Sequence, residues 1–261
     1  MIGKPVIELR NISKWYGNVR ALDDVSITVR DGEVTCFLGD NGAGKSTLIK
    51  ITSGLHPHDS GSLRIDGKDV HLSSPRQALD LGIATVYQDL ALVALMPVWR
   101  NFFLGSELLR GVRPLRRLDV QRMRRVAHEE LGKIGIDLPN IDAAVGKLSG
   151  GEMQVVAIAR AIYFGARVLI LDEPTAALGI KQSGIVLKYI AAAREKGLAV
   201  IFISHNPHHA YLVGDHFVVL HLGRSALDVD RSQITLEQLI GHMAGGAEIE
   251  ALAHELGHVT G

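Results

Sequence analysis

The chain has 261 residues, of which 47% are hydrophobic and 21% are charged, and its formal net charge at pH 7 is zero. This composition is typical of a globular protein and excludes disordered and fibrous classes, while the balanced charge argues against nucleic acid as the principal partner. The length suits one large α/β domain, or one domain that carries a subdomain. The single cysteine, Cys36, excludes an internal disulfide framework and is predicted to be a small core residue in a reducing compartment.

No targeting or membrane-spanning segment is recognisable in the sequence. The N-terminal residues lead directly into a strand-like segment, without the charged and apolar regions of a signal peptide. No run approaches the ~18 apolar residues that a transmembrane helix needs. We therefore expect any association with a membrane to be mediated by another chain.

Two strands and an aromatic pair are predicted before residue 31. Residues 5–11 begin a strand, and residues 25–30 alternate apolar and polar side chains as a second strand does. Between them lie Trp15 and Tyr16. Such rings are more often core or surface aromatics, but the ring of Tyr16 is also placed to stack on an adenine.

The glycine-rich stretch from Gly39 to Thr47 is the strongest signal in the chain. It fits the phosphate-loop pattern G-x-x-x-x-G-K-[ST], between a buried apolar run at 34–38 and a helix that continues through 48–51. Glycines let the backbone approach a polyphosphate, and successive N–H groups at a helix start form an anion-binding nest. The predicted ATP-binding residues are Gly39, Asp40, Asn41, Gly42, Ala43, Gly44, Lys45, Ser46 and Thr47, with Lys45 as the cation for the outer phosphates and Ser46 as a Mg²⁺ ligand.

An α/β pattern continues after the loop. The helix is predicted to end near Ser53, residues 60–65 form a strand that enters an Asp-Gly turn, and residues 83–87 form another short strand. Gln88 follows this strand. It is either an exposed loop glutamine or a ligand of Mg²⁺ or water that senses the γ-phosphate.

Residues 90–147 differ in character and are predicted to be a helical insertion. Residues 90–104 are apolar and interrupted by Pro97, and Asp119 caps a helix that Gly135 ends. The apolar positions with helical spacing are Met123, Val126, Ala127, Leu131 and Ile134.

Arginine is concentrated between residues 110 and 125. One interpretation is a nucleic-acid patch, and the other is a solvated helix face near anionic lipid headgroups. The zero net charge and the lack of interleaved aromatic residues favour the second interpretation. The arginines are at positions 110, 113, 116, 117, 122, 124 and 125.

Two stretches in the second half of the chain carry chemistry. Residues 148–154 read Leu-Ser-Gly-Gly-Glu-Met-Gln before a helix through Ala166, and a serine with two glycines at a helix start indicates a second anion site. A buried strand at 168–171 ends in Asp172 and Glu173. Asp172 is predicted to anchor Mg²⁺ through water, and Glu173 to polarise the attacking water.

The strand predicted at 197–203 ends in Ser204 and His205, whose ring is placed to reach a γ-phosphate. His208 and His209 are interpreted as bystanders. A hairpin near residues 217–224 and a helix at 235–243 close the fold.

The last residues contain a formal match to the zinc signature H-E-x-x-H, between His254 and His258. We reject a zinc site there. Gly257 weakens a helix, three residues remain to supply a third ligand, and chain ends fray.

Together these stretches resemble the nucleotide-binding subunit of an ABC transporter, in the family's order over residues 5–225. The combination of a Leu-Ser-Gly-Gly motif with a phosphate loop is far more specific for this family than either motif alone. The resemblance implies an α/β fold with a P-loop NTPase core of mainly parallel sheet, an N-terminal antiparallel β subdomain and an inserted α-helical subdomain. The matching residues are Tyr16, the loop 39–47, Gln88, 148–152, 168–173 and His205.

The implied ATPase domain covers residues 5–245, and residues 246–261 form a C-terminal tail. Within the domain, the core takes up about 5–89 and 155–225, and the helical subdomain about 90–154.

The resemblance also implies the activity and the partners. Members of the family hydrolyse ATP with Mg²⁺ as head-to-tail dimers and drive an integral membrane permease, so we expect a homodimer at the cytoplasmic face of the membrane and no nucleic-acid partner. The implied catalytic residues are Lys45, Glu173 and His205, and the Mg²⁺ residues are Ser46, Gln88 and Asp172. Ser149, Gly150 and Gly151 would contact the ATP of the partner subunit in trans.

A finer resemblance is to bacterial monosaccharide importers of the ribose and fructose type. It rests on the loop, on Arg-Asn-Phe-Phe-Leu-Gly at 100–105 and on Thr-Ala-Ala-Leu-Gly at 175–179, where Gly179 replaces the aspartate of most ABC ATPases. One copy of each motif implies two chains per transporter, served indirectly by a periplasmic or extracellular solute-binding protein. The alternatives are an importer for another small solute and a soluble ABC ATPase, whose paired domains or long coiled coil we do not find. In an importer, the apolar segment 90–105 would form the groove for a permease helix, with Val98 and Phe102 as contact residues.

Overall fold

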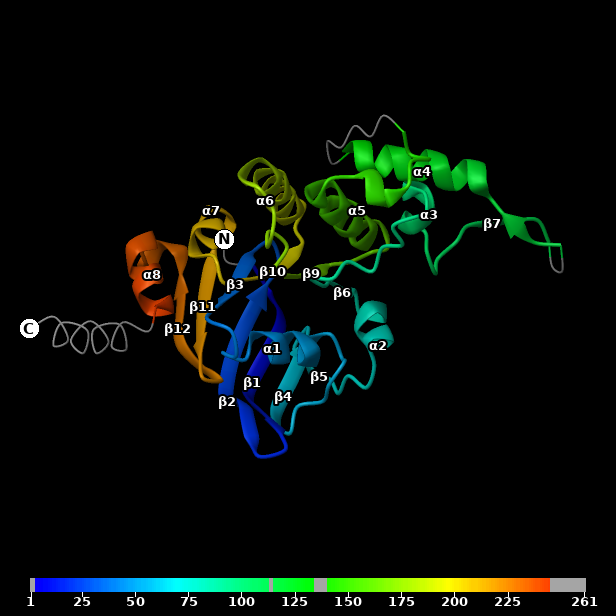
Figure 1. The fold of residues 1–261 in the computed structure, drawn as a ribbon. Helices are drawn as coiled ribbons and strands as arrows, with labels where there is room; N and C mark the ends of the chain where they lie inside the picture. Colours follow the sequence, from blue (N-terminus) through cyan, green and yellow to red (C-terminus); the bar gives the residue numbers. More distant parts are fainter. Residues whose placement is uncertain (1–2, 113–114, 134–139, 245–261) are drawn as a thin grey trace, which may run out of the picture.

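The computed structural model describes residues 3–112, 115–133 and 140–244. A six-stranded sheet forms its centre, with strand order β12-β11-β3-β10-β9-β6 (Figure 1). Five of these strands are parallel and β12 is antiparallel. Their bounds are β3 Val34–Leu38, β6 Ile83–Val86, β9 Val168–Asp172, β10 Ala199–Ser204, β11 His216–His221 and β12 Arg224–Asp230.

The order of the parallel strands decides where the polar loops meet. β10 lies between β3 and β9, with Ser204 paired to Leu38 and Ile203 paired to Asp172. Because parallel strands end at the same edge of a sheet, the glycine loop after β3 and the polar residues after β9 and β10 come together there.

A second sheet, formed by β1 (Pro5–Tyr16), β2 (Val19–Arg30), β4 (Ser60–Ile65) and β5 (Lys68–Asp69), is antiparallel with order β2-β1-β4-β5. Its first two strands are longer than the sequence pattern predicts. Register shifts between β1 and β2 interrupt the alternation of apolar and polar residues, which hides the full length of both strands from a pattern search.

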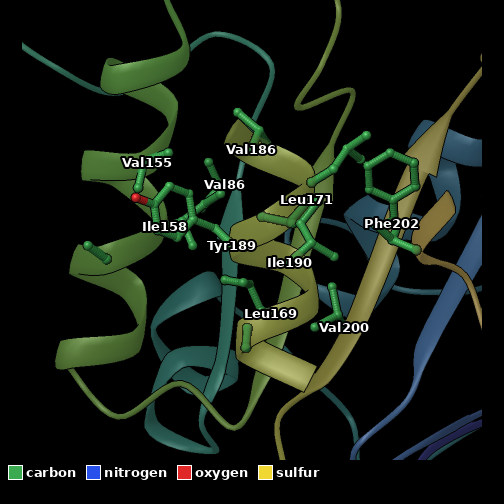
Figure 2. Close-up of a cluster of buried hydrophobic side chains, with 14 of the residues drawn as sticks. Val86, Val155, Ile158, Leu169, Leu171, Val186, Tyr189, Ile190, Val200 and Phe202 are labelled. Atoms are coloured by element: carbon green, nitrogen blue, oxygen red, sulfur yellow. The ribbon is translucent and has the colours of Figure 1, made fainter. Parts of the chain in front are cut away.

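Two hydrophobic cores lie on opposite faces of the central sheet. On β3, Cys36 belongs to one core and the adjacent Phe37 to the other, as expected for a strand buried on both faces. The prediction that Cys36 is a core residue is confirmed, since it is fully buried. Figure 2 shows side chains of α5 (Gly150–Tyr163) and α6 (Ile180–Glu195) packed against the sheet.

The remaining helices surround these sheets. They are α1 Lys45–Thr52, α2 Pro75–Asp80, α7 Pro207–Val213 and α8 Leu236–Met243, with short 3₁₀ helices at Val145–Lys147 and Arg231–Gln233. In the described part of the chain, no helix is both long and apolar enough to cross a membrane.

The insertion contains α3 (Val98–Phe102), α4 (Val120–Lys133) and the start of α5, and also a β-hairpin that the sequence pattern missed. The hairpin strands, β7 (Leu109–Arg110) and β8 (Arg117–Leu118), are two residues long, which is too short to produce a periodic signal. The α4 helix is confirmed, and its cap is Asp119, whose Oδ1 accepts a hydrogen bond from the Arg122 N–H. Ile134 and Gly135 lie outside the described residues.

Two sequence predictions for this region are wrong. α5 ends at Tyr163 rather than at Ala166, because Gly165 has φ of 90° and breaks the helix. Val98 and Phe102 are fully buried in the core, so neither contacts a partner. An apolar side chain satisfies the pattern of a core and of a docking surface equally well, and the sequence does not separate the two.

Candidate functional site

The loop between β3 and α1 has a backbone that requires glycine. Gly39, Gly42 and Gly44 have φ of 135°, 85° and 107°, a region that other residues rarely adopt. A Cβ on Gly39 would lie 2.3 Å from the Leu220 carbonyl oxygen, and one on Gly44 would lie 2.8 Å from the Leu22 side chain. Gly44 caps α1 without a side-chain hydrogen bond. The first N–H groups of α1 therefore face the loop without a side-chain acceptor, which is the arrangement that binds phosphate.

Lys45 is the first residue of α1, and its ammonium group lies over the loop. Nζ donates hydrogen bonds to the carbonyl oxygens of Gly39 (2.6 Å) and Asp40 (2.9 Å). Burial lowers the pKa of Lys45, and the carboxylates of Glu173, Asp40 and Asp172 oppose this shift. The lysine thus connects the loop electrostatically with the acidic end of β9.

Asp172 and Glu173 lie where β9 ends. Burial, reinforced by the charge of Glu173, raises the pKa of Asp172, and Lys45 opposes the shift. Glu173 has φ of 48°, a conformation that costs free energy in a non-glycine residue. Its N–H donates to the Ile203 carbonyl oxygen at 3.1 Å, which holds this strained turn against β10.

The Glu173 carboxylate is positioned by the residues that follow β10. His205 Nδ1 lies 3.0 Å from Glu173 Oε1, and the Ser204 hydroxyl donates to Glu173 Oε2 at 3.4 Å. The Glu173 side chain is 12% exposed and that of His205 is 60% exposed. The geometry gives a nearly buried carboxylate, oriented by a solvent-facing histidine, beside the lysine of the glycine loop.

His209, interpreted from sequence as a bystander, contacts this region. Its Nδ1 lies 3.0 Å from the Thr175 hydroxyl, two residues after Glu173, and burial lowers the pKa of His209. The sequence carried no signal for this contact, because His209 lies within α7 and His205 lies before the cap of that helix. His208 contributes only its N–H, to the Asn206 side chain that caps α7.

Tyr16 and Gln88 lie at strand ends, and in the described part of the chain neither makes a hydrogen bond to the glycine loop. Tyr16 ends β1 and is 40% exposed, with the His56 ring edge-on at 5.8 Å. The neighbouring Trp15 ring is covered by the Arg20 guanidinium at 5.0 Å. Gln88 is exposed and follows β6, the neighbour of β9 in the sheet.

Ser149, Gly150 and Gly151 lie at the N-terminus of α5, and the local structure of this helix end accounts for their residue types. The Ser149 hydroxyl accepts a hydrogen bond from the Glu152 N–H at 3.3 Å, and Glu152 Oε2 accepts one from the Ser149 N–H at 2.7 Å, which is a capping box. A Cβ on Gly150 would lie 2.7 Å from the Leu178 side chain. Within the described residues, no hydrogen bond joins 149–151 to the glycine loop of the same chain.

The described residues contain no group of three or more histidine, cysteine, aspartate or glutamate side chains that would hold a metal ion. The zinc-signature match at 254–258 lies outside them. A preformed cluster is not expected for Mg²⁺, which takes one or two protein oxygens and completes its shell with water and phosphate. The Ser46 hydroxyl, the Asp172 carboxylate and the Gln88 amide oxygen are ligands of this hard-oxygen type.

Comparisons with known proteins show the family of this chain. The family model described as ABC transporter matches residues 22–176. A xylose/arabinose import ATP-binding protein of Sulfolobus acidocaldarius is 42% identical over 90% of this chain and 92% of its own length. A fructose import ATP-binding protein of Rhizobium meliloti is 40% identical over 95% of this chain and 97% of its own length. A ribose import ATP-binding protein of Burkholderia ambifaria is 40% identical over 93% of this chain, but over only 47% of its own length.

Solved structures confirm the predicted fold class. The ADP conformation of an ATP-binding cassette of an ABC transporter matches with a TM-score of 0.80 and 25% identity, over 95% of this chain and 98% of that one. A nucleotide-free cassette matches with a TM-score of 0.77 and 26% identity, over 87% of this chain and 92% of that one. A dimeric bacterial cassette matches with a TM-score of 0.71 and 25% identity, over 86% of this chain and 98% of that one.

Proposed function

This chain belongs to the ABC transporter family, and on that premise we propose that it hydrolyses ATP to energise an importer of a monosaccharide. The observation that carries the hydrolytic part is the meeting of Lys45, Glu173 and His205 at adjacent strand ends. The assignment of a monosaccharide as the solute is supported by two relatives whose length the chain spans almost completely. They are import ATP-binding proteins for xylose or arabinose and for fructose.

In the proposed reaction, the glycine loop binds the phosphates of ATP and Lys45 neutralises negative charge on the outer phosphates. Glu173 accepts a proton from the attacking water as a new oxygen–phosphorus bond forms and ADP leaves. His205 holds the Glu173 carboxylate through the 3.0 Å contact and, being exposed, is within reach of a γ-phosphate. Mg²⁺, held by Ser46, Asp172 and Gln88, would neutralise phosphate charge. We propose that the adenine base of ATP stacks on the exposed ring of Tyr16.

The site is proposed to be completed by a second copy of the chain. A γ-phosphate held by one loop alone is open to water on one side. The start of α5, with Ser149, Gly150 and Gly151, has N–H groups suited to an anion. Among the residues that the structure describes it makes no hydrogen bond to its own chain's glycine loop, so we assign these residues to the partner's ATP. The likeness to a dimeric cassette supports this arrangement.

A permease helix is proposed to dock in an apolar groove of about 290 Å³. The groove is lined by β6 and by Tyr87, which is next to Gln88. Its other walls come from α2, the segment 90–92 and α5, with Ser53 and Ser106 at its margin. Leu79 on α2, 46% exposed, and Phe164 after α5, 36% exposed, replace the buried Val98 and Phe102 as contact residues. Docking there places the chain, as a peripheral subunit, on the cytoplasmic face of the membrane, with a solute-binding protein acting on the other side.

The ATPase domain is proposed to span residues 5–245, with the division into core and helical subdomain given above. The boundary at 154 lies within α5, which packs on both parts. Residues 246–261 have no assigned role.

The experiment that tests the function is sugar uptake by cells that lack the gene. Uptake of one monosaccharide should be lost and restored by the wild-type gene, but not by Lys45→Ala, which removes the phosphate cation. The control Lys68→Ala, on an exposed residue of β5, should restore uptake. Unchanged uptake of every monosaccharide, with loss of uptake of another small solute, would favour the alternative substrate class. No transport defect at all would favour a soluble ABC ATPase.

A further inference from the structure

The hairpin of β7 and β8 has two chemically different faces. Leu109 pairs with Leu118, and Arg110 pairs with Arg117. Paired residues share a face and successive residues alternate, so the leucines lie on one face and the arginines on the other. Leu109 is 53% exposed and Leu118 is 39% exposed, so the rest of the chain leaves the apolar face largely uncovered.

Two further apolar residues between β7 and β8 are exposed. Val112 is 78% exposed and Leu115 is 74% exposed. Single exposed apolar side chains are common, but four within residues 109–118, interleaved with arginines, give this segment an exposed surface that is both apolar and cationic, a combination that favours a membrane interface. Figure 1 shows β7 extending away from α3 and α5.

The positive charge of this region has little internal compensation. Residues 109–125 contain seven arginines and one acidic residue, Asp119, which is engaged in capping α4. Arg124 pairs with Asp142 at 2.7 Å, whereas Arg110, Arg116 and Arg117 form no ion pair within the described part of the chain. Like charges directly opposite each other destabilise a ribbon, so the Arg110–Arg117 pair would be relieved by an anion.

We propose that this hairpin contacts an anionic lipid surface, with its arginines on the headgroups and Val112 and Leu115 entering the interface. The inference rests on the proposed function, which places the chain beside a permease. The hairpin begins close to the groove proposed for the permease, because Ser106, which precedes β7 by a few residues, lines that groove. The Asp119 N–H donates to the Leu108 carbonyl oxygen at 2.8 Å and closes the base of the hairpin.

Anionic lipid fits this surface better than nucleic acid. Binding of single strands uses aromatic side chains that stack on bases, and residues 109–125 contain none. The exposed valine and leucine have no function against a phosphate backbone, but they gain from burial among acyl chains.

The test is co-sedimentation of the full chain with vesicles, either of equal parts phosphatidylglycerol and phosphatidylcholine or of phosphatidylcholine alone. The double variant Arg110→Gln/Arg117→Gln is compared with Lys68→Gln/Lys188→Gln, which removes the same charge from exposed sites elsewhere. The wild type and the control should bind the anionic vesicles, and the arginine variant should bind roughly 10- to 30-fold more weakly. Val112→Ser/Leu115→Ser should weaken binding about tenfold or more, and its loss should persist at high salt, because it removes apolar burial rather than charge.

ATP hydrolysis of each variant in solution is measured in parallel, because the hairpin is separate from the nucleotide site. Equal binding by the arginine variant and its control, or no binding of the wild type to anionic vesicles, would overturn the lipid proposal while the ATPase remained intact. Hairpin-dependent binding to duplex DNA without vesicle binding would overturn it in favour of nucleic acid. Vesicle binding by a chain without ATPase activity would instead contradict the proposed function.

Discussion

His205 Nδ1 lies 3.0 Å from Glu173 Oε1, across the ends of two neighbouring parallel strands. This contact joins residues 32 positions apart and holds the carboxylate at a turn where Glu173 has φ of 48°. Strain of this kind persists where the surrounding structure fixes it, and it is common at active sites. The contact joins one exposed histidine to one nearly buried carboxylate, the pair to which we assign a role in hydrolysis.

Substitution of Trp15 and Tyr16, the two adjacent aromatic residues at the end of β1, tests which ring stacks on adenine. Tyr16→Ala should raise the ATP concentration needed for half-maximal hydrolysis, by a factor corresponding to about 1–3 kcal/mol of lost stacking, and leave turnover at saturation nearly unchanged. Trp15→Ala is the matched control, because that ring is adjacent and almost equally exposed but is not assigned to the adenine. Steady-state kinetics of both variants decide the assignment. If only Trp15→Ala raised the ATP concentration needed for half-maximal hydrolysis, Trp15 and not Tyr16 would be the ring that stacks on adenine.

The groove proposed for the permease is tested with charged substitutions on exposed leucines. Leu79→Glu should abolish sugar uptake and spare the ATPase activity of the isolated chain, because it places a charge in an apolar docking surface. Leu212→Glu, on α7 and 69% exposed, should spare both activities. Normal uptake in cells that carry Leu79→Glu would exclude this groove as the docking site.

The pH dependence of stability is predicted from His216, which lies between two carboxylates. Its Nδ1 lies 2.7 Å from Asp230 Oδ1, and its Nε2 contacts Asp228. Burial lowers the pKa of His216, but hydrogen bonds to both aspartates and the charge of Glu33 outweigh it, so the pKa is raised. The stabilisation is therefore complete below the unfolded pKa of about 6.5 and is lost as pH rises through the higher folded value.

Urea unfolding at a series of pH values checks this prediction. The free energy of unfolding of the wild type should fall between about pH 6.5 and the folded pKa, and that of His216→Gln should lack this part of the slope. Parallel pH profiles for the two proteins would mean that His216 is not the group responsible.

Much of the fold and of the candidate site was predictable from sequence, for identifiable reasons. Buried parallel strands are continuous apolar runs, and the glycines of residues 39–44 are required by backbone angles that few other residues adopt. The contact of His209 with Thr175 was not predictable, because it depends on how α7 packs over the turn after β9. Nor was the burial of Phe102, because composition alone does not say which side of an apolar helix faces the protein.

The composite site is tested by the association state of variants that bind ATP but turn it over slowly. Glu173→Gln should be a dimer with MgATP and a monomer with ADP, because ATP binds the closed dimer better than the open one. Adding Ser149→Arg should keep the chain monomeric while ATP stays bound, since the larger side chain obstructs the partner's nucleotide. Sedimentation velocity distinguishes the two forms. If the double variant dimerised as readily as Glu173→Gln, the start of α5 would not cap ATP in trans.

The most direct test of ATP hydrolysis by this site is phosphate release from saturating MgATP by purified wild type and Glu173→Gln. The substitution keeps the size and hydrogen-bonding capacity of the side chain but removes its basicity, so turnover should fall by at least about 100-fold while ATP binding remains. Glu129→Gln, on an exposed residue of α4, should match the wild type. Turnover by Glu173→Gln within a factor of about two of the wild type would contradict the assignment of Glu173 as the base that activates water.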